Sequence, residues 1–267
     1  MGTTRLHGGK TIVTKRPWIG TSWKMNKTIR EADAFCEALR ASDWSKQSDR
    51  AQLFVIPPFT VLHRVAERLD ETDVIVGAQN AHWENAGAWT GEISPAQVKD
   101  CGGRLVEIGH SERRTFFNET DETVAKKTAA AVRNGLTALV CIGDTREEYE
   151  AGRTAEVLKR QTQAAISKVE WAGGAKVIIA YEPVWSIGEG GTPADPAFAD
   201  EQHARIKELT AAELGTPLSV LYGGSVNPAN CVDLANRPNI DGLFIGRSAW
   251  KAEGYLGIVS DVVSSLA

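Results

Sequence analysis

The sequence predicts a single domain of the (β/α)8 barrel class, and three observations support this prediction. From Trp18 onward, short apolar runs alternate with longer segments of helical period, without a proline-rich linker or a break in composition. This alternation gives eight strand candidates in roughly 250 residues, which is the usual size of such a barrel. No G-x-G-x-x-G motif follows the first candidate, which disfavours an open dinucleotide-binding sheet. We therefore expect residues 17–267 to form the barrel and residues 1–16 to be an N-terminal extension.

The expected strands are short apolar runs that end in glycine or polar residues. They cover residues 18–23, 53–56, 74–79, 105–109, 138–142, 176–180, 219–222 and 242–245. The helices between them have recognisable ends. Capping-box spacing places helix starts at Thr28 with Glu31 and at Thr145 with Glu148. One apolar stripe follows the first of these starts: Ile29, Ala32, Phe35, Cys36 and Leu39. Another helix ends at Asn134 and Gly135.

Composition and charge limit the classes of molecule that the protein is expected to bind. A net charge of −4 and a pI near 5.8 provide no basic field for nucleic acid. No apolar run is long enough to span a membrane, and residues 1–16 lack the apolar core of a signal peptide. The four cysteines lie far apart, without a C-x-x-C pair that would indicate zinc or a redox dithiol. We expect a cytoplasmic protein with neither a nucleic-acid nor a membrane partner.

Reactive side chains follow several of the expected strands, at the end where barrels hold their chemistry. After the first, fourth and sixth strands they are Lys24, then His110 and Glu112, and then Glu182. Glu182 leads into a glycine-rich loop, a combination suited to proton transfer under a mobile lid. Glycines follow the last two strands, where backbone N–H groups often hold a phosphate: Gly223, Gly224 and Gly246. A small phosphorylated substrate is therefore expected.

Each of these residues also has an ordinary structural interpretation. His110 could be a hydrogen-bonded histidine at the barrel mouth, Lys24 a solvated cation at a strand end, and the glycines after the seventh strand a simple turn. A base, an imidazole, a cation and a phosphate cup at four strand ends are jointly hard to attribute to chance. The combination favours a catalytic site.

Four longer motifs resemble the triosephosphate isomerase family. They are SWKMN at 22–26, EIGHSERR at 107–114, AYEPVWSIG at 180–188 and LYGGSVNPAN at 221–230, and the likeness extends from about Trp18 to the C-terminus. The resemblance implies an intramolecular oxidoreductase that interconverts ketose or aldose phosphates through an enediolate, without a metal or organic cofactor. The roles that the resemblance implies for individual residues are those known for the family, and they are not deduced from residue spacing.

By this resemblance Glu182 is the base, His110 is a neutral electrophile, Lys24 supplies positive charge and Glu112 is a further acid of the site. Residues 185–192 would form the lid. The phosphate would be held by Gly188, Ser225, Gly246 and Arg247, beside Gly223 and Gly224. Ser22 would face the sugar.

The stretch from Gly77 to Ser94 resembles the protruding loop through which members of this family dimerise. Thr90, at its tip, would reach the partner's active site. Trp83 and Trp89 in this loop would be costly to leave in water, at about 25 cal/mol per Å² of apolar area. A homodimer is therefore expected.

Three positions depart from the family pattern. Ser22 replaces an asparagine, Arg247 replaces the second of two adjacent glycines, and the lid ends in residues 188–193, GEGGTP, instead of GTGKTA. A smaller side chain at position 22 would admit a larger sugar. This pattern resembles the tetrulose-phosphate branch of the family, which implies interconversion of L-erythrulose 1-phosphate and D-erythrulose 4-phosphate in erythritol breakdown. The alternative is the glycolytic interconversion of dihydroxyacetone phosphate and D-glyceraldehyde 3-phosphate.

Two other classes of function remain open from the sequence. An aldolase that forms a Schiff base would need an activated lysine, for which Lys24 is the main candidate. A sugar-phosphate sensor without catalytic activity would retain the phosphate loops but would not need Glu182 or His110. Borohydride trapping and a turnover assay, respectively, distinguish these cases.

Overall fold

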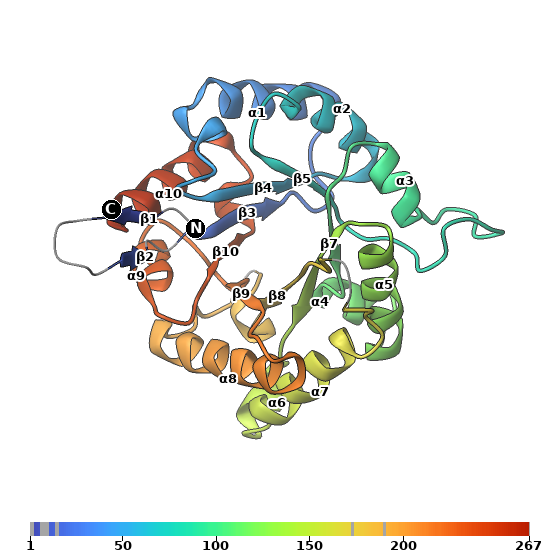
Figure 1. Cartoon of the computed structure of the whole chain (residues 1–267), viewed down its shortest axis with the longest axis vertical. Coiled ribbons are helices and arrows are strands. Elements are labelled where there is room, and N and C mark those ends of the chain that lie inside the picture. The colour runs from blue at the N-terminus through green and yellow to red at the C-terminus, as the bar shows by residue number, and fades with distance from the viewer. Residues whose placement is uncertain (1–2, 6–10, 14–15, 172–173, 189–190, 267) are drawn as a thin grey trace.

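A computed structural model describes residues 3–5, 11–13, 16–171, 174–188 and 191–266. Eight parallel strands form a closed barrel in the order β10-β3-β4-β5-β6-β7-β8-β9 (Figure 1). The strands are β3 (Trp18–Ser22), β4 (Gln52–Ile56), β5 (Ile75–Ala78), β6 (Leu105–Ile108), β7 (Thr137–Ile142), β8 (Val177–Tyr181), β9 (Ser219–Tyr222) and β10 (Gly242–Ile245). The predicted fold class is confirmed. Each of the eight expected strands is present, with ends that differ by one residue at most.

Helices surround the barrel as an outer ring (Figure 1). The α-helices are α1 (Ile29–Ala41), α2 (Phe59–Leu69), α3 (Pro95–Asp100), α4 (Ser111–Phe116), α5 (Asp121–Arg133), α6 (Arg146–Glu150), α7 (Thr154–Ile166), α8 (Pro196–Leu214), α9 (Cys231–Asn236) and α10 (Ala252–Ser265). Three single 3-10 turns are η1 (Asp43–Lys46), η2 (Val184–Ser186) and η3 (Arg247–Ala249). No helix in the described part of the chain has the length and apolar character of a membrane span.

The expected helix ends are present. Both predicted capping boxes form, at Thr28 and at Thr145, and Asn134 caps the end of α5 before Gly135, which has φ 76°. The apolar stripe on α1 is confirmed except at Ile29, which is 59% exposed. Ile29 is the first residue of α1, one turn before the residues of the stripe that are buried.

Two apolar layers hold the barrel together. The inner layer fills the barrel with side chains such as Phe54, Leu105 and Leu139, while the outer layer joins the strands to the helices. Because successive side chains on a strand face opposite sides, Leu105 points into the barrel and Val106 points toward the helices. The same alternation determines which residues at the carboxyl ends of the strands face the interior of the barrel.

Two segments lie outside the barrel wall. β1 (Thr3–Arg5) and β2 (Thr11–Val13) form a separate antiparallel pair within the N-terminal extension, which the sequence did not predict. Residues 1–2, 6–10 and 14–15 of the extension are outside the described residues, and the boundary at residue 17 stays a prediction. The segment between β5 and α3 projects away from the barrel as a long loop (Figure 1).

Candidate active site

The reactive residues that the sequence singled out lie together at the carboxyl ends of the strands. Glu182 follows β8, and its Oε1 lies 3.4 Å from Nε2 of His110, which follows β6. Lys24 follows β3, and its Nζ donates to Glu112 Oε1 at 2.6 Å. A carboxylate, an imidazole and an ammonium group, contributed by three strands, therefore share one face of the barrel.

Glu182 is 2% exposed and held in place through both its backbone and its side chain. Its amide donates to Ile142 O at 2.7 Å, and its Oε2 accepts the Ser111 amide at 3.2 Å. Gly143 is required beside it, because a Cβ at that position would lie 1.8 Å from the Glu182 carbonyl oxygen. The surrounding backbone therefore fixes the position from which this carboxylate acts.

The hydrogen bonding of His110 fixes the tautomer of its ring. The Glu112 amide donates to Nδ1 at 3.1 Å, so Nδ1 is an acceptor and the proton of a neutral ring is on Nε2. Nε2 faces Glu182, and His110 is 6% exposed. A neutral imidazole in this orientation can donate a hydrogen bond to a substrate oxygen.

Lys24 has a backbone conformation that is rare for a side chain of its type. Its φ is 52°, in the left-handed region, and Gln79 Nε2 donates to its carbonyl at 2.9 Å. Strain of this kind is common where a functional side chain must point in one direction. The conformation places the ammonium group of Lys24 on the wall of two neighbouring cavities.

The two cavities have different chemistry. The first, of about 190 Å³, is lined among others by Ser22, Lys24, Glu107, His110 and Glu112. The second, of about 200 Å³, is lined among others by Lys24, Gly188, Gly224, Ser225, Gly246 and Arg247. Backbone amides and two cationic side chains suit the second cavity to a phosphate group, and the first cavity suits the carbon chain of the substrate.

Of the residues predicted to bind the phosphate, Gly223 is the one that lies away from the second cavity. It is not among the residues that line the second cavity; a Cβ on it would lie 2.9 Å from Glu182 Cγ. Gly224 is confined by Tyr222 and Ser186, because a Cβ there would lie 2.4 Å from the Tyr222 hydroxyl. Direct contact of these residues with substrate stays a prediction.

Glu107 is a residue of this site that sequence reasoning missed. It is 2% exposed, accepts a hydrogen bond from Ser22 Oγ at 2.8 Å and lies 3.9 Å from His110 Nε2. Burial raises the pKa of its carboxyl to about 7, against the opposing effect of His110. A single acid within the apolar run of residues 105–108 was the available signal.

The first part of the expected lid lies over a polar and aromatic support. The Trp185 ring stacks on Tyr149 with ring centroids 4.3 Å apart, and its Nε1 donates to Asp144 Oδ2 at 3.4 Å. The backbone oxygen of Trp185 accepts from Arg146 at 3.1 Å. Residues 189–190 of the lid are outside the described residues, so the departure at position 189 has no structural account.

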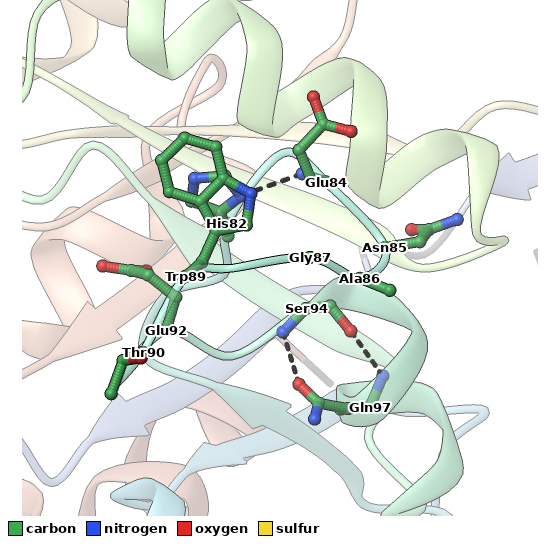
Figure 2. A pocket seen from close by; sticks show the side chains of 10 residues that line it. All are labelled: His82, Glu84, Asn85, Ala86, Gly87, Trp89, Thr90, Glu92, Ser94 and Gln97. Atoms are coloured by element: carbon green, nitrogen blue, oxygen red, sulfur yellow. Dashed lines mark hydrogen bonds between the residues drawn. The ribbon is translucent and has the colours of Figure 1, made fainter.

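The protruding loop after β5 curls around a cavity of about 390 Å³, shown in Figure 2. Trp89 packs over His82 with ring centroids 4.4 Å apart and is still 49% exposed. Trp83 stacks on the same imidazole at 4.1 Å. Thr90 is exposed next to Trp89 in this loop.

No cluster of three or more histidine, cysteine or acidic side chains suited to a metal ion occurs among the described residues. All four cysteines are free.

The comparisons with known proteins agree with this geometry. A sequence model of the family described as "Triosephosphate isomerase" matches residues 17–262. A protein of Rhizobium etli named L-erythrulose-1-phosphate isomerase is 56% identical over 250 residues, which cover 93% of each chain. Relatives of the same name from Rhizobium meliloti and Brucella abortus are each 55% identical, over 93% and 91% of this chain and 98% and 95% of their own.

Proposed function

The chain belongs to the triosephosphate isomerase family, and from this membership we propose that it interconverts L-erythrulose 1-phosphate and D-erythrulose 4-phosphate. The observation that carries the proposal is the 56% identity, over 93% of the chain, to a protein named for the first of these sugars. The site geometry supports the chemistry. An imidazole and a cation line one cavity, the base lies 3.4 Å from that imidazole, and a cavity suited to phosphate adjoins the first at Lys24.

The reaction moves a carbon-bound proton from C3 to C2 and a hydroxyl proton from the C3 oxygen to the C2 oxygen, so the carbonyl changes place with the neighbouring hydroxyl group. Glu182 removes the proton from C3 of L-erythrulose 1-phosphate, and the C3–H electron pair forms the C2–C3 double bond of an enediolate. His110 Nε2–H and Lys24 stabilise the oxygens that become negative. Glu182 then returns a proton to C2, the hydroxyl proton passes from the C3 oxygen to the C2 oxygen, and the carbonyl re-forms at the original C3, which gives D-erythrulose 4-phosphate. Atoms and electrons balance without a metal or an organic cofactor.

The phosphate keeps the sugar in place while the proton moves. Lys24 and Arg247 provide positive charge at the phosphate cavity, and Gly188, Gly224 and Gly246 allow its backbone amides to approach the anion. We assign the lid of residues 185–192 the role of excluding water, because an exposed enediolate phosphate loses its phosphate group. The same arrangement would serve a triose phosphate, which lacks only the terminal hydroxymethyl group.

A second copy of this chain is the proposed partner. Met25 and Phe117 line the catalytic cavity and are 96% and 62% exposed. Apolar side chains exposed at the mouth of an active site are typical of a surface that another chain covers. The protruding loop with its half-exposed Trp89 supplies a complementary apolar element, and Thr90 would then lie near the partner's site. Four free cysteines support a reducing compartment such as the cytoplasm.

The proposal is tested by kcat/KM measured side by side for L-erythrulose 1-phosphate and dihydroxyacetone phosphate. We expect a clear preference for the four-carbon sugar. The variant Ser22→Asn should lower that preference by roughly tenfold to a hundredfold, because the larger side chain occupies the space of the extra carbon. An unmodified enzyme that prefers dihydroxyacetone phosphate would overturn the assignment in favour of the glycolytic reaction.

A further inference from the structure

The carboxyl group of Glu107 has no role in the reaction described so far, although it lies beside the groups that perform it. Glu107 shares the interior side of β6 with Leu105, since the two residues are two positions apart on one strand. Ser22 occupies the end of β3, and Cys141, in the inner layer, lies on β7. Glu107 therefore replaces what would otherwise be one more apolar side chain at the top of the barrel interior.

This carboxyl has few partners for its degree of burial. It accepts one hydrogen bond, from Ser22 Oγ, and no lysine or arginine of the described residues forms an ion pair with it. A carboxylate has about four acceptor positions, and buried polar groups that lack partners are costly. Glu107 also lines the catalytic cavity. The partner that completes its hydrogen bonding would therefore enter through that cavity.

The position of Glu107 relative to the base indicates which part of the substrate it meets. Glu182 Oε1 and Glu107 Oε1 lie 3.4 Å and 3.9 Å from the same nitrogen, His110 Nε2. The carbon that loses its proton must lie next to Glu182, and in the four-carbon sugar this carbon also carries the terminal hydroxymethyl group. A hydroxyl one carbon further along can reach Glu107 while the proton faces Glu182.

We propose that Glu107, oriented by Ser22, binds the terminal hydroxyl group of the four-carbon substrate and so determines specificity for it. This inference rests on the proposed function, because a triose phosphate has no hydroxyl at that place. Ser22 has two effects here: its small size leaves room for the extra carbon, and its hydroxyl fixes Oε2 of Glu107, which leaves Oε1, 3.9 Å from His110 Nε2, for the substrate.

The experiment compares L-erythrulose 1-phosphate with its 4-deoxy analogue, which retains all four carbons and lacks only the terminal hydroxyl. Parent enzyme and the variants Glu107→Leu and Glu107→Gln are assayed with both compounds. Both values of kcat/KM come from one preparation, so a reduced fraction of folded enzyme cancels in their ratio. Glu107→Gln serves as the matched control, because it removes the charge but keeps the size and a hydrogen-bonding oxygen.

We expect the parent to prefer the hydroxylated sugar by at least about a hundredfold, as sites built to bind a hydroxyl do. Glu107→Leu should reduce this ratio by at least about tenfold, the size of one hydrogen bond to a charged group. Glu107→Gln should retain most of it. A ratio in Glu107→Leu within about twofold of the parent's would overturn the inference. So would equal losses on both compounds in the two variants, which would mean that the Glu107 charge acts only on His110 and Glu182.

Failure of the proposed function gives a different result. In that case the parent and both variants at position 107 would prefer dihydroxyacetone phosphate. A parent that prefers the four-carbon sugar, with an unchanged hydroxyl ratio in Glu107→Leu, would leave the proposed function in place and refute only the role of Glu107.

Discussion

The Glu182 carboxylate interacts with two neighbouring groups. When a substrate binds, the carboxylate must either leave these groups or interact with them and the substrate together. The Ser111 amide donates to one oxygen at 3.2 Å, and His110 Nε2 lies 3.4 Å from the other. A carboxylate that carries a proton between two neighbouring carbons has to be placed with an accuracy of less than about 1 Å. The length of this side chain therefore matters as much as its charge.

The variant Glu182→Asp shortens the side chain by one methylene and withdraws the base from the carbon. We expect kcat to fall by at least about a hundredfold, with little change in KM, because the phosphate contacts remain. Steady-state kinetics with L-erythrulose 1-phosphate measures both values. Glu156→Asp, on the exposed face of α7, is the matched control and should be unaffected. Near-normal turnover in Glu182→Asp would show that another residue is the base.

Glu107 should make the stability of the protein depend on pH. Burial raises the pKa of its carboxyl from 4.5 to about 7. Below both values the carboxyl is protonated in the folded and unfolded states and contributes nothing. Between them the folded state keeps a proton that the unfolded state has lost, so the free energy of unfolding falls as pH rises. Above pH 7 the full cost is roughly 3 kcal/mol.

The variant Glu107→Gln removes this titration and retains the shape of the side chain. We therefore expect it to be more stable than the parent at pH 8, with a clearly smaller difference at pH 5. Chemical unfolding of both proteins at the two pH values measures this, and the comparison cancels the titrating groups that do not interact with Glu107, which excludes His110, Glu182 and Lys24. The idea fails if the difference in stability is the same at both pH values.

The sequence predicted the reactive residues of the site better than the residues that surround them. Glu182, His110 and Lys24 could be identified because each is a reactive side chain directly after an apolar run. Glu107 lies inside such a run, and its direction depends on the register of β6, which places Leu105 and Glu107 on the same side. Its hydrogen bond to Ser22 joins residues 85 positions apart, and no local pattern reports such a contact.

At the scale of elements, segments at both ends of the proposed lid lie near one tyrosine. The Tyr222 hydroxyl is buried and has no hydrogen bond of good geometry within the described part of the chain. It lies close to Gly224 and to Ser186 of η2; burial raises its pKa, and weak hydrogen-bonding contacts with the Ser186 side chain and the Ala194 backbone oppose that rise. A buried hydroxyl without a partner is costly, so we expect it to gain one when the lid closes.

The variant Tyr222→Phe should therefore impair closure without harming the folded state. We expect unchanged or slightly higher thermal stability, since an unsatisfied hydroxyl is removed. We also expect more inorganic phosphate to be released per isomerised sugar, because water reaches the enediolate. Phosphate release and product formation are measured in the same reaction. A normal ratio of the two, together with a loss of stability, would mean that Tyr222 only packs the barrel.

The elements themselves were largely predictable for a physical reason. Strands buried on both faces are continuous apolar runs, and each helix start with a capping box carries its own signal, as at Thr28. β1 and β2 were missed because each has only three residues and neither belongs to the apolar alternation that begins at Trp18. The resemblance identified the protruding loop, whereas apolar periodicity did not.

At the scale of the whole molecule, the site is proposed to be complete only in a dimer. The variant Thr90→Arg would place a long charged side chain in the partner's surface, where burial without a counter-charge is costly. We expect sedimentation to show dissociation, and activity to fall in parallel with it. Thr216→Arg, an exposed residue in the connection from α8 to β9, is the control and should remain a dimer. A fully active, well-folded monomer would contradict the proposal that the partner completes the site.

The central claim is that one enzyme carboxylate moves a proton between neighbouring carbons of a phosphorylated four-carbon sugar through an enediolate. The most direct measurement is incubation of L-erythrulose 1-phosphate with the enzyme in D₂O for many turnovers, followed by NMR of the sugar phosphates. The account predicts D-erythrulose 4-phosphate as product, with deuterium on the carbon that gained the proton, and no labelling with Glu182→Gln. Product that contains no deuterium after equilibration would indicate direct hydride transfer between the carbons and would contradict the account.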